Sequence, residues 1–227
     1  MRGIILGLFA LALLGGGVTR AEEACEPWVP PPPPKADPSK PAPAPKPPRP
    51  PEFWVISGGT AGPEIAMLGD SLTTPHFGQT VSALLGNRQY KIYALGGTSA
   101  QMLADLFDKE TMPTDAVGLI WIGRNNNPAD VELVLGSIER AAARFPSGKY
   151  LVLNVLSGRN ADEQPGGGKR VKMDALNEAI AAAHGDRVIA VRPLVACSDF
   201  VDHIHLNKPA EDNIAQAVAE AVRARGW

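Results

Sequence analysis

Ser71 lies where a buried strand is expected to end, in surroundings that suit a nucleophile. The run Ile65 to Leu68 is apolar, Gly69-Asp70-Ser71 follows it, and an amphipathic helical pattern begins near Phe77. In an open parallel sheet, this order places a side chain at the carboxyl edge, where such sheets bind ligands. Gly-Asp-Ser is also common in ordinary turns, so Ser71 is a candidate nucleophile that still needs a base.

An acid and a base occur together in Asp202-His203-Ile204-His205, after the last predicted strand. A neutral imidazole, with an ordinary pKa of about 6.5, can remove the proton of a serine hydroxyl. A carboxylate bonded to the other ring nitrogen orients the ring and stabilises the imidazolium. We therefore expect Ser71, Asp202 and His205 to act together. The two histidines and Asp202 could instead bind a metal, but apart from Cys197 no other histidine or cysteine lies near them in the sequence to complete a zinc site, so we expect no metal and no cofactor.

Hydrogen-bond donors for a developing oxyanion follow two other predicted strands. Gly96-Gly97-Thr98 can bring a backbone N–H close to a ligand, and Asn125 offers a side-chain amide. Loss of one such donor typically lowers the rate of acyl transfer by roughly 10² to 10³. Arg124 is expected either to bind an anionic or sugar group of a substrate, or to pair with a nearby acid at the rim.

Apolar, β-rich runs alternate with segments of helical period from about residue 52 onward. Strands that are apolar on both faces and alternate with helices indicate a parallel sheet covered on both sides. We therefore predict an α/β fold, a three-layer α/β/α sandwich around a five-stranded parallel sheet. The predicted strands are Glu64–Leu68, Tyr90–Leu95, Val117–Ile122, Tyr150–Leu156 and Arg187–Val191. The predicted helices are Phe77–Leu85, Ser99–Phe107, Val131–Phe145, Val171–His184 and Glu211–Arg223. Residues 158–170 are polar and glycine-rich, and we expect a disordered surface loop or a flap over a pocket.

With these residues in view, the chain resembles the GDSL, or SGNH, hydrolase family. Four segments carry the resemblance in order: Gly69-Asp70-Ser71-Leu72, Gly96-Gly97, Gly123-x-Asn125 and Asp202-x-x-His205. The resemblance implies Ser71 as nucleophile, His205 as base and Asp202 as its partner. It also implies a flavodoxin-like strand order 2-1-3-4-5 and an oxyanion hole, built from the backbone N–H groups of Ser71 and Gly97 and the Asn125 side chain.

Two departures from the family pattern concern the oxyanion hole. Asn125 is followed by Asn126, where the family usually has aspartate, and the spacing leaves Gly96 as a substitute for Gly97.

The first 51 residues differ in composition from the rest. Arg2, an apolar run from Gly3 to Val18, and small residues around Arg20 are typical of a signal peptide over residues 1–21, with a retained anchor as the alternative. Residues 22–51 are rich in proline, which favours an extended tether over a docking motif. Residues 52–227 are expected to form one catalytic domain.

Charge and cysteine content narrow the function further. Without Arg2 and Arg20, 20 basic residues face 24 acidic ones, a formal charge of −4, so we expect no nucleic-acid partner. The mature form has no expected membrane span, and its location would be secreted or periplasmic. Cys25 and Cys197 either pair in a disulfide or remain free thiols.

The expected function is a secreted serine esterase that forms an acyl-enzyme on Ser71. Its substrate would be a carbohydrate, lipid or small-molecule ester with an acetyl or other short acyl group. The alternatives on the same fold are an acyltransferase and a non-hydrolytic module that binds a glycan of the cell envelope. The pattern leaves the oligomeric state open.

Overall fold

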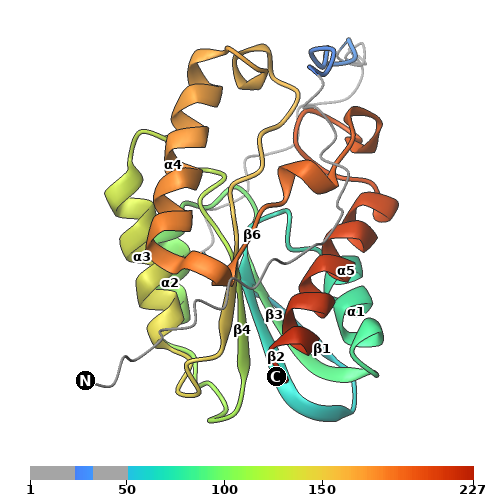
Figure 1. The fold of residues 1–227 in the computed structure, drawn as a ribbon, viewed down its shortest axis with the longest axis vertical. Coiled ribbons are helices and arrows are strands. Elements are labelled where there is room, and N and C mark those ends of the chain that lie inside the picture. The colour runs from blue at the N-terminus through green and yellow to red at the C-terminus, as the bar shows by residue number, and fades with distance from the viewer. Residues whose placement is uncertain (1–23, 33–50) are drawn as a thin grey trace, which may run out of the picture.

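The computed structural model describes residues 24–32 and 51–227, which include a mixed sheet flanked by helices (Figure 1). Within these ranges the sheet has six strands in the order β1-β3-β2-β4-β5-β6. The strands are β1 (Trp54–Gly58), β2 (Ala61–Gly69), β3 (Arg88–Ala94), β4 (Val117–Trp121), β5 (Tyr150–Leu153) and β6 (Val188–Ile189). Strands β2 to β6 pair in parallel, and β1 pairs with β3 in antiparallel orientation.

The five predicted parallel strands and their flavodoxin-like order are confirmed. The prediction of a five-stranded sheet was incomplete, because it omitted the antiparallel edge strand β1. Side chains of β1 are mostly exposed, including Trp54 and Val55. The run Phe53 to Ile56 is apolar, like the runs by which the other strands were predicted, but it directly follows the proline-rich stretch and was not assigned to a strand.

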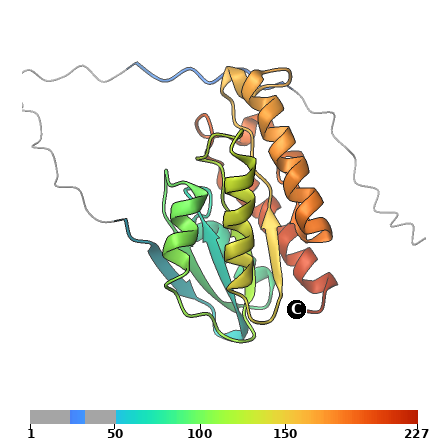
Figure 2. The same ribbon diagram turned by 90° about the vertical axis from the view of Figure 1, so that its left-hand side faces the viewer.

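Helices cover both faces of the sheet, which confirms the three-layer arrangement (Figure 2). The helices are α1 (Pro75–Leu84), α2 (Ala100–Phe107), α3 (Val131–Ala143), α4 (Gly168–His184) and α5 (Lys208–Ala224). Helices α1 and α5 pack against one face, where Ile65 and Met67 of β2 point. Helices α2, α3 and α4 pack against the other face, where Ala66 and Leu68 point. This alternation along β2 is the period of two that a strand buried on both faces must show.

Polar caps start several helices close to the carboxyl edge of the sheet. The Thr74 hydroxyl accepts a hydrogen bond from the backbone N–H of Phe77 at 3.1 Å, and Asn207 accepts one from Ala210 at 3.0 Å. Each cap satisfies an N–H group that the first turn of a helix cannot pair internally. The segments that lead from the strands into these helices carry the predicted site residues.

Residues 158–170 are folded, so the first of the two predicted alternatives, a disordered surface loop, is wrong. They include a 3₁₀ turn (Ala161–Glu163) and the first residues of α4. The turn is anchored by Glu163, whose side chain is fully buried among hydrogen-bond donors. A polar segment that folds around a buried carboxylate has no apolar pattern by which it could be predicted.

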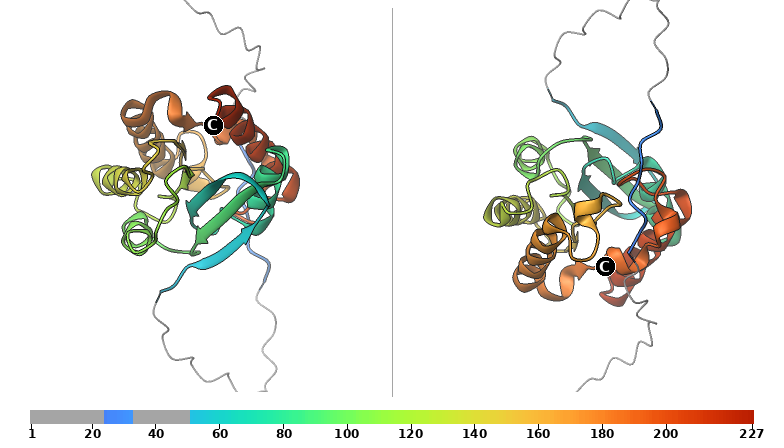
Figure 3. Two further views of the ribbon diagram at one scale, coloured as in Figure 1. Left: turned by 90° about the horizontal axis from the view of Figure 1, so that it is seen from below. Right: turned by 90° about the horizontal axis from the view of Figure 1, so that it is seen from above.

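Residues 24–32, predicted as part of the tether, pack against the domain at the carboxyl end of the sheet. A disulfide joins Cys25, which is buried, to Cys197, with 5.2 Å between the Cα atoms. Figure 3 shows this short blue segment crossing the molecule in the view from above. The predicted signal peptide and most of the predicted tether lie outside the described residues. None of the described helices is both long enough and apolar enough to cross a membrane.

Candidate active site

A tight turn after β2 presents Ser71. Asp70 accepts hydrogen bonds from the N–H of Leu72 through its side chain, at 3.0 Å, and from the N–H of Thr73 through its carbonyl, at 3.1 Å. A Cβ atom at Gly69 would lie 1.7 Å from Oγ1 of Thr73, so the turn requires glycine there. Ser71 itself remains half-buried, with its side chain accessible.

His205 and Asp202 complete a hydrogen-bonded chain that begins at Ser71. His205 Nε2 lies 3.0 Å from Ser71 Oγ, and His205 Nδ1 lies 2.7 Å from Asp202 Oδ2. These distances are within hydrogen-bonding range for a nucleophile, a base and an orienting acid. The structure therefore brings together the three predicted side chains, although 134 positions separate Ser71 from His205.

The loop that carries Asp202 and His205 is closed on itself by backbone hydrogen bonds. Phe200 and Leu206 form an isolated antiparallel bridge, and the N–H of Val201 donates to the carbonyl of His205 at 2.9 Å. The other carboxylate oxygen of Asp202 accepts the N–H groups of Ile204 and His205, both at 2.7 Å. Asp202 thus shapes its loop as well as holding the imidazole.

Hydrogen bonding keeps the Asp202 carboxylate ionised. Partial burial alone would raise its pKa, but the His205 ring and the N–H groups of His205 and Ile204 outweigh this effect. The pKa falls to about 2. A carboxylate in this state favours the tautomer of His205 that has its proton on Nδ1 and a free lone pair on Nε2, facing Ser71.

Asn125 lies beside the same turn, but its amide already has partners. Its Nδ2 donates to Asp70 Oδ2 at 3.2 Å and to the carbonyl of Thr98 at 3.3 Å. Asp70 is almost completely buried, and this desolvation raises its pKa to about 6 even though Leu72, Arg124 and His205 act to lower it. The buried carboxyl group of Asp70 therefore holds the amide of Asn125, the predicted donor, beside the turn that presents Ser71.

Gly96, rather than Gly97, is packed against Ser71. A Cβ atom built on Gly96 would lie 3.4 Å from Cβ of Ser71, whereas one on Gly97 would meet nothing within 4 Å. Gly97 has φ +71°, a left-handed conformation that favours glycine. Gly96 thus allows the backbone to lie close to Ser71, and Gly97 allows the chain to turn.

Arg124 pairs with an acidic residue, which is the second of the two roles predicted for it. Its guanidinium is buried and donates to both carboxylate oxygens of Glu163, at 2.8 and 3.0 Å. Glu163 also accepts hydrogen bonds from Lys169 at 2.6 Å and from the N–H of Gly158 at 2.7 Å. Burial alone would raise its pKa, but the cations Arg124 and Lys169 and the N–H of Gly158 lower it. Arg124 therefore holds the 3₁₀ turn in place instead of facing solvent.

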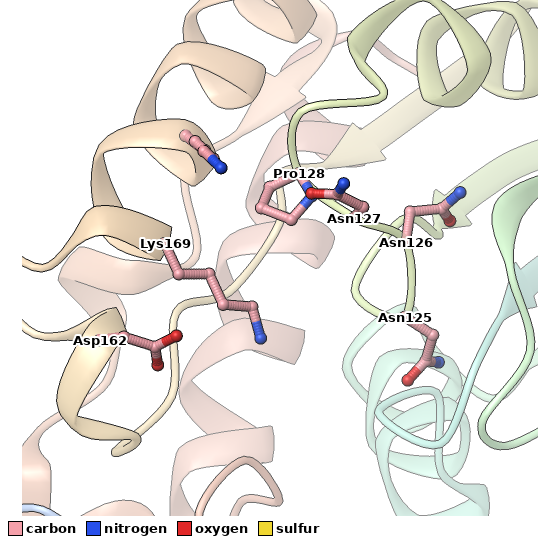
Figure 4. Close-up of a pocket in the computed structure, with 7 residues that line it drawn as sticks. Asn125, Asn126, Asn127, Pro128, Asp162 and Lys169 are labelled. Atoms are coloured by element: carbon pink, nitrogen blue, oxygen red, sulfur yellow. The ribbon is translucent and has the colours of Figure 1, made fainter.

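A polar cleft of about 400 Å³ extends from Asn125 to the start of α4, and we call it the Asn125–Lys172 cleft (Figure 4). Its lining residues are Asn125, Asn126, Asn127, Pro128, Asp162, Lys169 and Lys172. Sequence reasoning missed the acidic and basic residues of this wall. The available signal was the density of polar side chains in residues 158–170, which were predicted as a loop or a flap, and in the first residues of the predicted helix that follows.

No family model matches the chain, and no curated protein matches it either. Solved structures do resemble it. A member of the lipolytic protein G-D-S-L family from Veillonella parvula aligns with a TM-score of 0.56 and 19% identity, over 70% of this chain and 97% of its own. A carbohydrate esterase family 2 enzyme from Corynascus thermopiles (Myceliophthora fergusii) aligns with a TM-score of 0.53 and 17% identity, over 74% of this chain and 69% of its own. The chain therefore has the fold of the GDSL and SGNH hydrolases.

Proposed function

We propose that this protein is a secreted serine esterase that hydrolyses a carboxylic ester through an acyl-enzyme on Ser71. The observation that carries the proposal is the hydrogen-bonded chain from Ser71 Oγ through the His205 ring to Asp202. The resemblance in fold to a lipolytic G-D-S-L protein and to a carbohydrate esterase supports the same reaction class. The Cys25–Cys197 disulfide supports an oxidising compartment, because such bonds rarely persist in the cytosol.

The reaction follows from the geometry in two halves. His205 Nε2 accepts the proton of Ser71 as Oγ attacks the ester carbonyl, and Asp202 stabilises the imidazolium that forms. The imidazolium then protonates the departing alcohol, which leaves the acyl group on Ser71. Water, deprotonated by His205, attacks this acyl group, and His205 returns the proton to Ser71 as the carboxylic acid is released.

The oxyanion of each tetrahedral intermediate would be stabilised by Asn125 together with the N–H of Ser71 and a glycine N–H. One of the two Asn125 hydrogen bonds must be exchanged for this purpose. The contact to the Thr98 carbonyl is the longer one, at 3.3 Å, and is the one we expect the oxyanion to replace.

The test is hydrolysis of p-nitrophenyl esters of increasing chain length and of acetylated polysaccharides by wild-type protein and by Ser71→Ala. We expect Ser71→Ala to lose about 10⁴-fold or more in kcat while remaining folded. Ser198→Ala is the matched control, because Ser198 is exposed and lies on the same loop as Asp202. A serine-reactive phosphonate should label Ser71. Folded wild-type protein that gives neither labelling nor turnover would rule out the esterase.

A further inference from the structure

The position of the Asn125–Lys172 cleft fits the part of a substrate next to the scissile ester. Asn125, at one end of the cleft, also contacts the turn that presents Ser71 through Asp70. An ester carbonyl placed at Ser71 would therefore direct one of its two substituents into this cleft. We propose that this substituent is the alcohol and that it carries a carboxylate, which binds near Lys169 and Lys172. The proposal rests on the esterase function and names its substrate class.

The lining of the cleft favours a polar ligand over a fatty acyl chain. Of the described residues that line it, Pro128 alone lacks a polar side chain. Asn125 and Asn127 are exposed, and the side chain of Asn127 accepts just one local bond, from the N–H of Ala129 at 3.2 Å. An apolar chain would remove water from these amides and charges without replacing its hydrogen bonds, which is unfavourable. A hydroxylated alcohol can replace them.

The charges around the cleft favour an anion. Figure 4 shows the Lys169 side chain extending from α4 into the space between Asp162 and the loop Asn125–Asn127. Lys169 and Arg124 both bond to the carboxylate of Glu163, and Arg124 also acts to lower the pKa of the buried Asp70, so the charges of these two cations are already balanced. Among the described residues, no hydrogen bond or ion pair involves the Lys172 side chain.

Among the described residues that line the cleft, Asp162 is the acidic one, and Lys169 and Lys172 are the basic ones. Because Lys169 is bonded to Glu163, Lys172 is the lysine whose charge remains available for a ligand, and a carboxylate can accept hydrogen bonds from more than one lysine.

The test compares two acetyl esters that differ in one group, 4-acetoxybenzoate and 4-acetoxybenzamide. We expect Lys172→Glu to lower the ratio of kcat/KM for the anionic ester to that for the neutral ester by about fivefold at low salt, and by less at high salt. Taking the ratio across variants cancels the different leaving-group chemistry of the two esters. Lys109→Glu is the matched control, because it makes the same charge change beyond the C-terminal end of α2, and it should leave the ratio unchanged.

A binding measurement separates this proposal from the esterase function. Calorimetry of both esters with Ser71→Ala, alone and combined with Lys172→Glu, does not depend on turnover. Tighter binding of the anionic ester that is lost with Lys172→Glu supports the carboxylate site even if no ester is hydrolysed. Hydrolysis without any charge preference, in binding or in kcat/KM, would overturn the site and leave the esterase intact.

Discussion

The indole of Trp28 packs against the imidazole of His203, with 5.3 Å between the ring centroids. His203 lies two residues before His205, and its Nδ1 is 3.9 Å from the carboxylate of Asp202. Arg159 joins the same two segments, because its N–H donates to the carbonyl of His203 at 2.7 Å and its carbonyl accepts the N–H of Trp28 at 3.2 Å. Residues 24–32 therefore support the loop that carries the proposed base.

Trp28→Ala should weaken catalysis more than it weakens the fold. Loss of the ring contact removes about 0.5–1.5 kcal/mol of packing from the loop, and we expect kcat/KM to fall by about twofold to tenfold. Trp28→Phe should restore most of the loss, because an aromatic ring remains against His203. Trp54→Ala is the control, since Trp54 is exposed on the edge strand β1. Equal kcat/KM values for Trp28→Ala and wild type would contradict this role.

The Cys25–Cys197 disulfide should stabilise the whole domain. It joins residues 172 positions apart and so restricts the unfolded chain strongly. We expect Cys25→Ser/Cys197→Ser to lower the free energy of unfolding by about 2–5 kcal/mol, measured by urea denaturation without reductant. Wild-type protein in reductant should behave like the double variant, and the double variant should not respond to reductant. A reductant effect on the double variant would show that the loss has another cause.

Asp202→Asn tests the orientation of His205 directly. An asparagine can keep the size of the side chain but supplies no negative charge to the imidazolium, so we expect kcat to fall by about 10³ to 10⁴. The comparison is Asp130→Asn, because Asp130 is exposed before α3 and its side chain makes no cap hydrogen bond. Circular dichroism should show that both variants are folded. A kcat for Asp202→Asn within tenfold of wild type would remove Asp202 from the proposed mechanism.

Glu163→Gln should destabilise the wall of the Asn125–Lys172 cleft. The change removes the negative charge with which Arg124 and Lys169 pair, and it leaves the buried guanidinium of Arg124 without its bonded carboxylate partner. Breaking a buried pair in this way typically costs about 3–5 kcal/mol of unfolding free energy. Glu132→Gln, at an exposed position in the first turn of α3, is the control. A loss below about 1 kcal/mol would indicate that the pair is effectively solvated.

The sequence was most informative where a local pattern of residues determines the structure. Buried runs such as Ile65 to Leu68 predicted the parallel strands, and the order of the segments around Ser71 and His205 predicted which side chains would meet. The role of Glu163 was not predictable in this way. Its partner Arg124 lies 39 positions upstream, and nothing in a polar, glycine-rich segment indicates a buried carboxylate.

Trp28 and Cys25 show a second limit of prediction from the sequence. Both lie at the start of a proline-rich stretch whose composition predicts a tether without a core. Whether two cysteines can pair depends on the separation of their Cα atoms, which composition does not supply. The structure was needed to show that this segment reaches the loop of the proposed base.

Asp70 should make stability decrease as the pH rises, in contrast to Asp202. Desolvation raises the folded-state pKa of Asp70 from 3.8 to about 6, so the folded protein holds this proton more tightly than the unfolded chain. Between about pH 4 and 6 the unfolded chain therefore releases the proton first, and stability falls by up to about 3 kcal/mol as the pH rises through this window. Asp202, with a folded-state pKa of about 2, instead loses its contribution below about pH 4.

Asp70→Asn isolates this effect, because the asparagine does not titrate. The unfolding free energy of the variant minus that of wild type should increase by about 2–3 kcal/mol between pH 4 and about 7, while contributions from all other groups cancel. Ser198→Ala, at an exposed position without a titratable side chain, should give a difference that does not change with pH. A flat difference for Asp70→Asn would mean that Asp70 is ionised in the folded protein as easily as in the unfolded chain. The burial of Asp70 beneath Ser71 would then not control whether the Asp70 carboxyl group, which accepts the hydrogen bond from Asn125, is ionised.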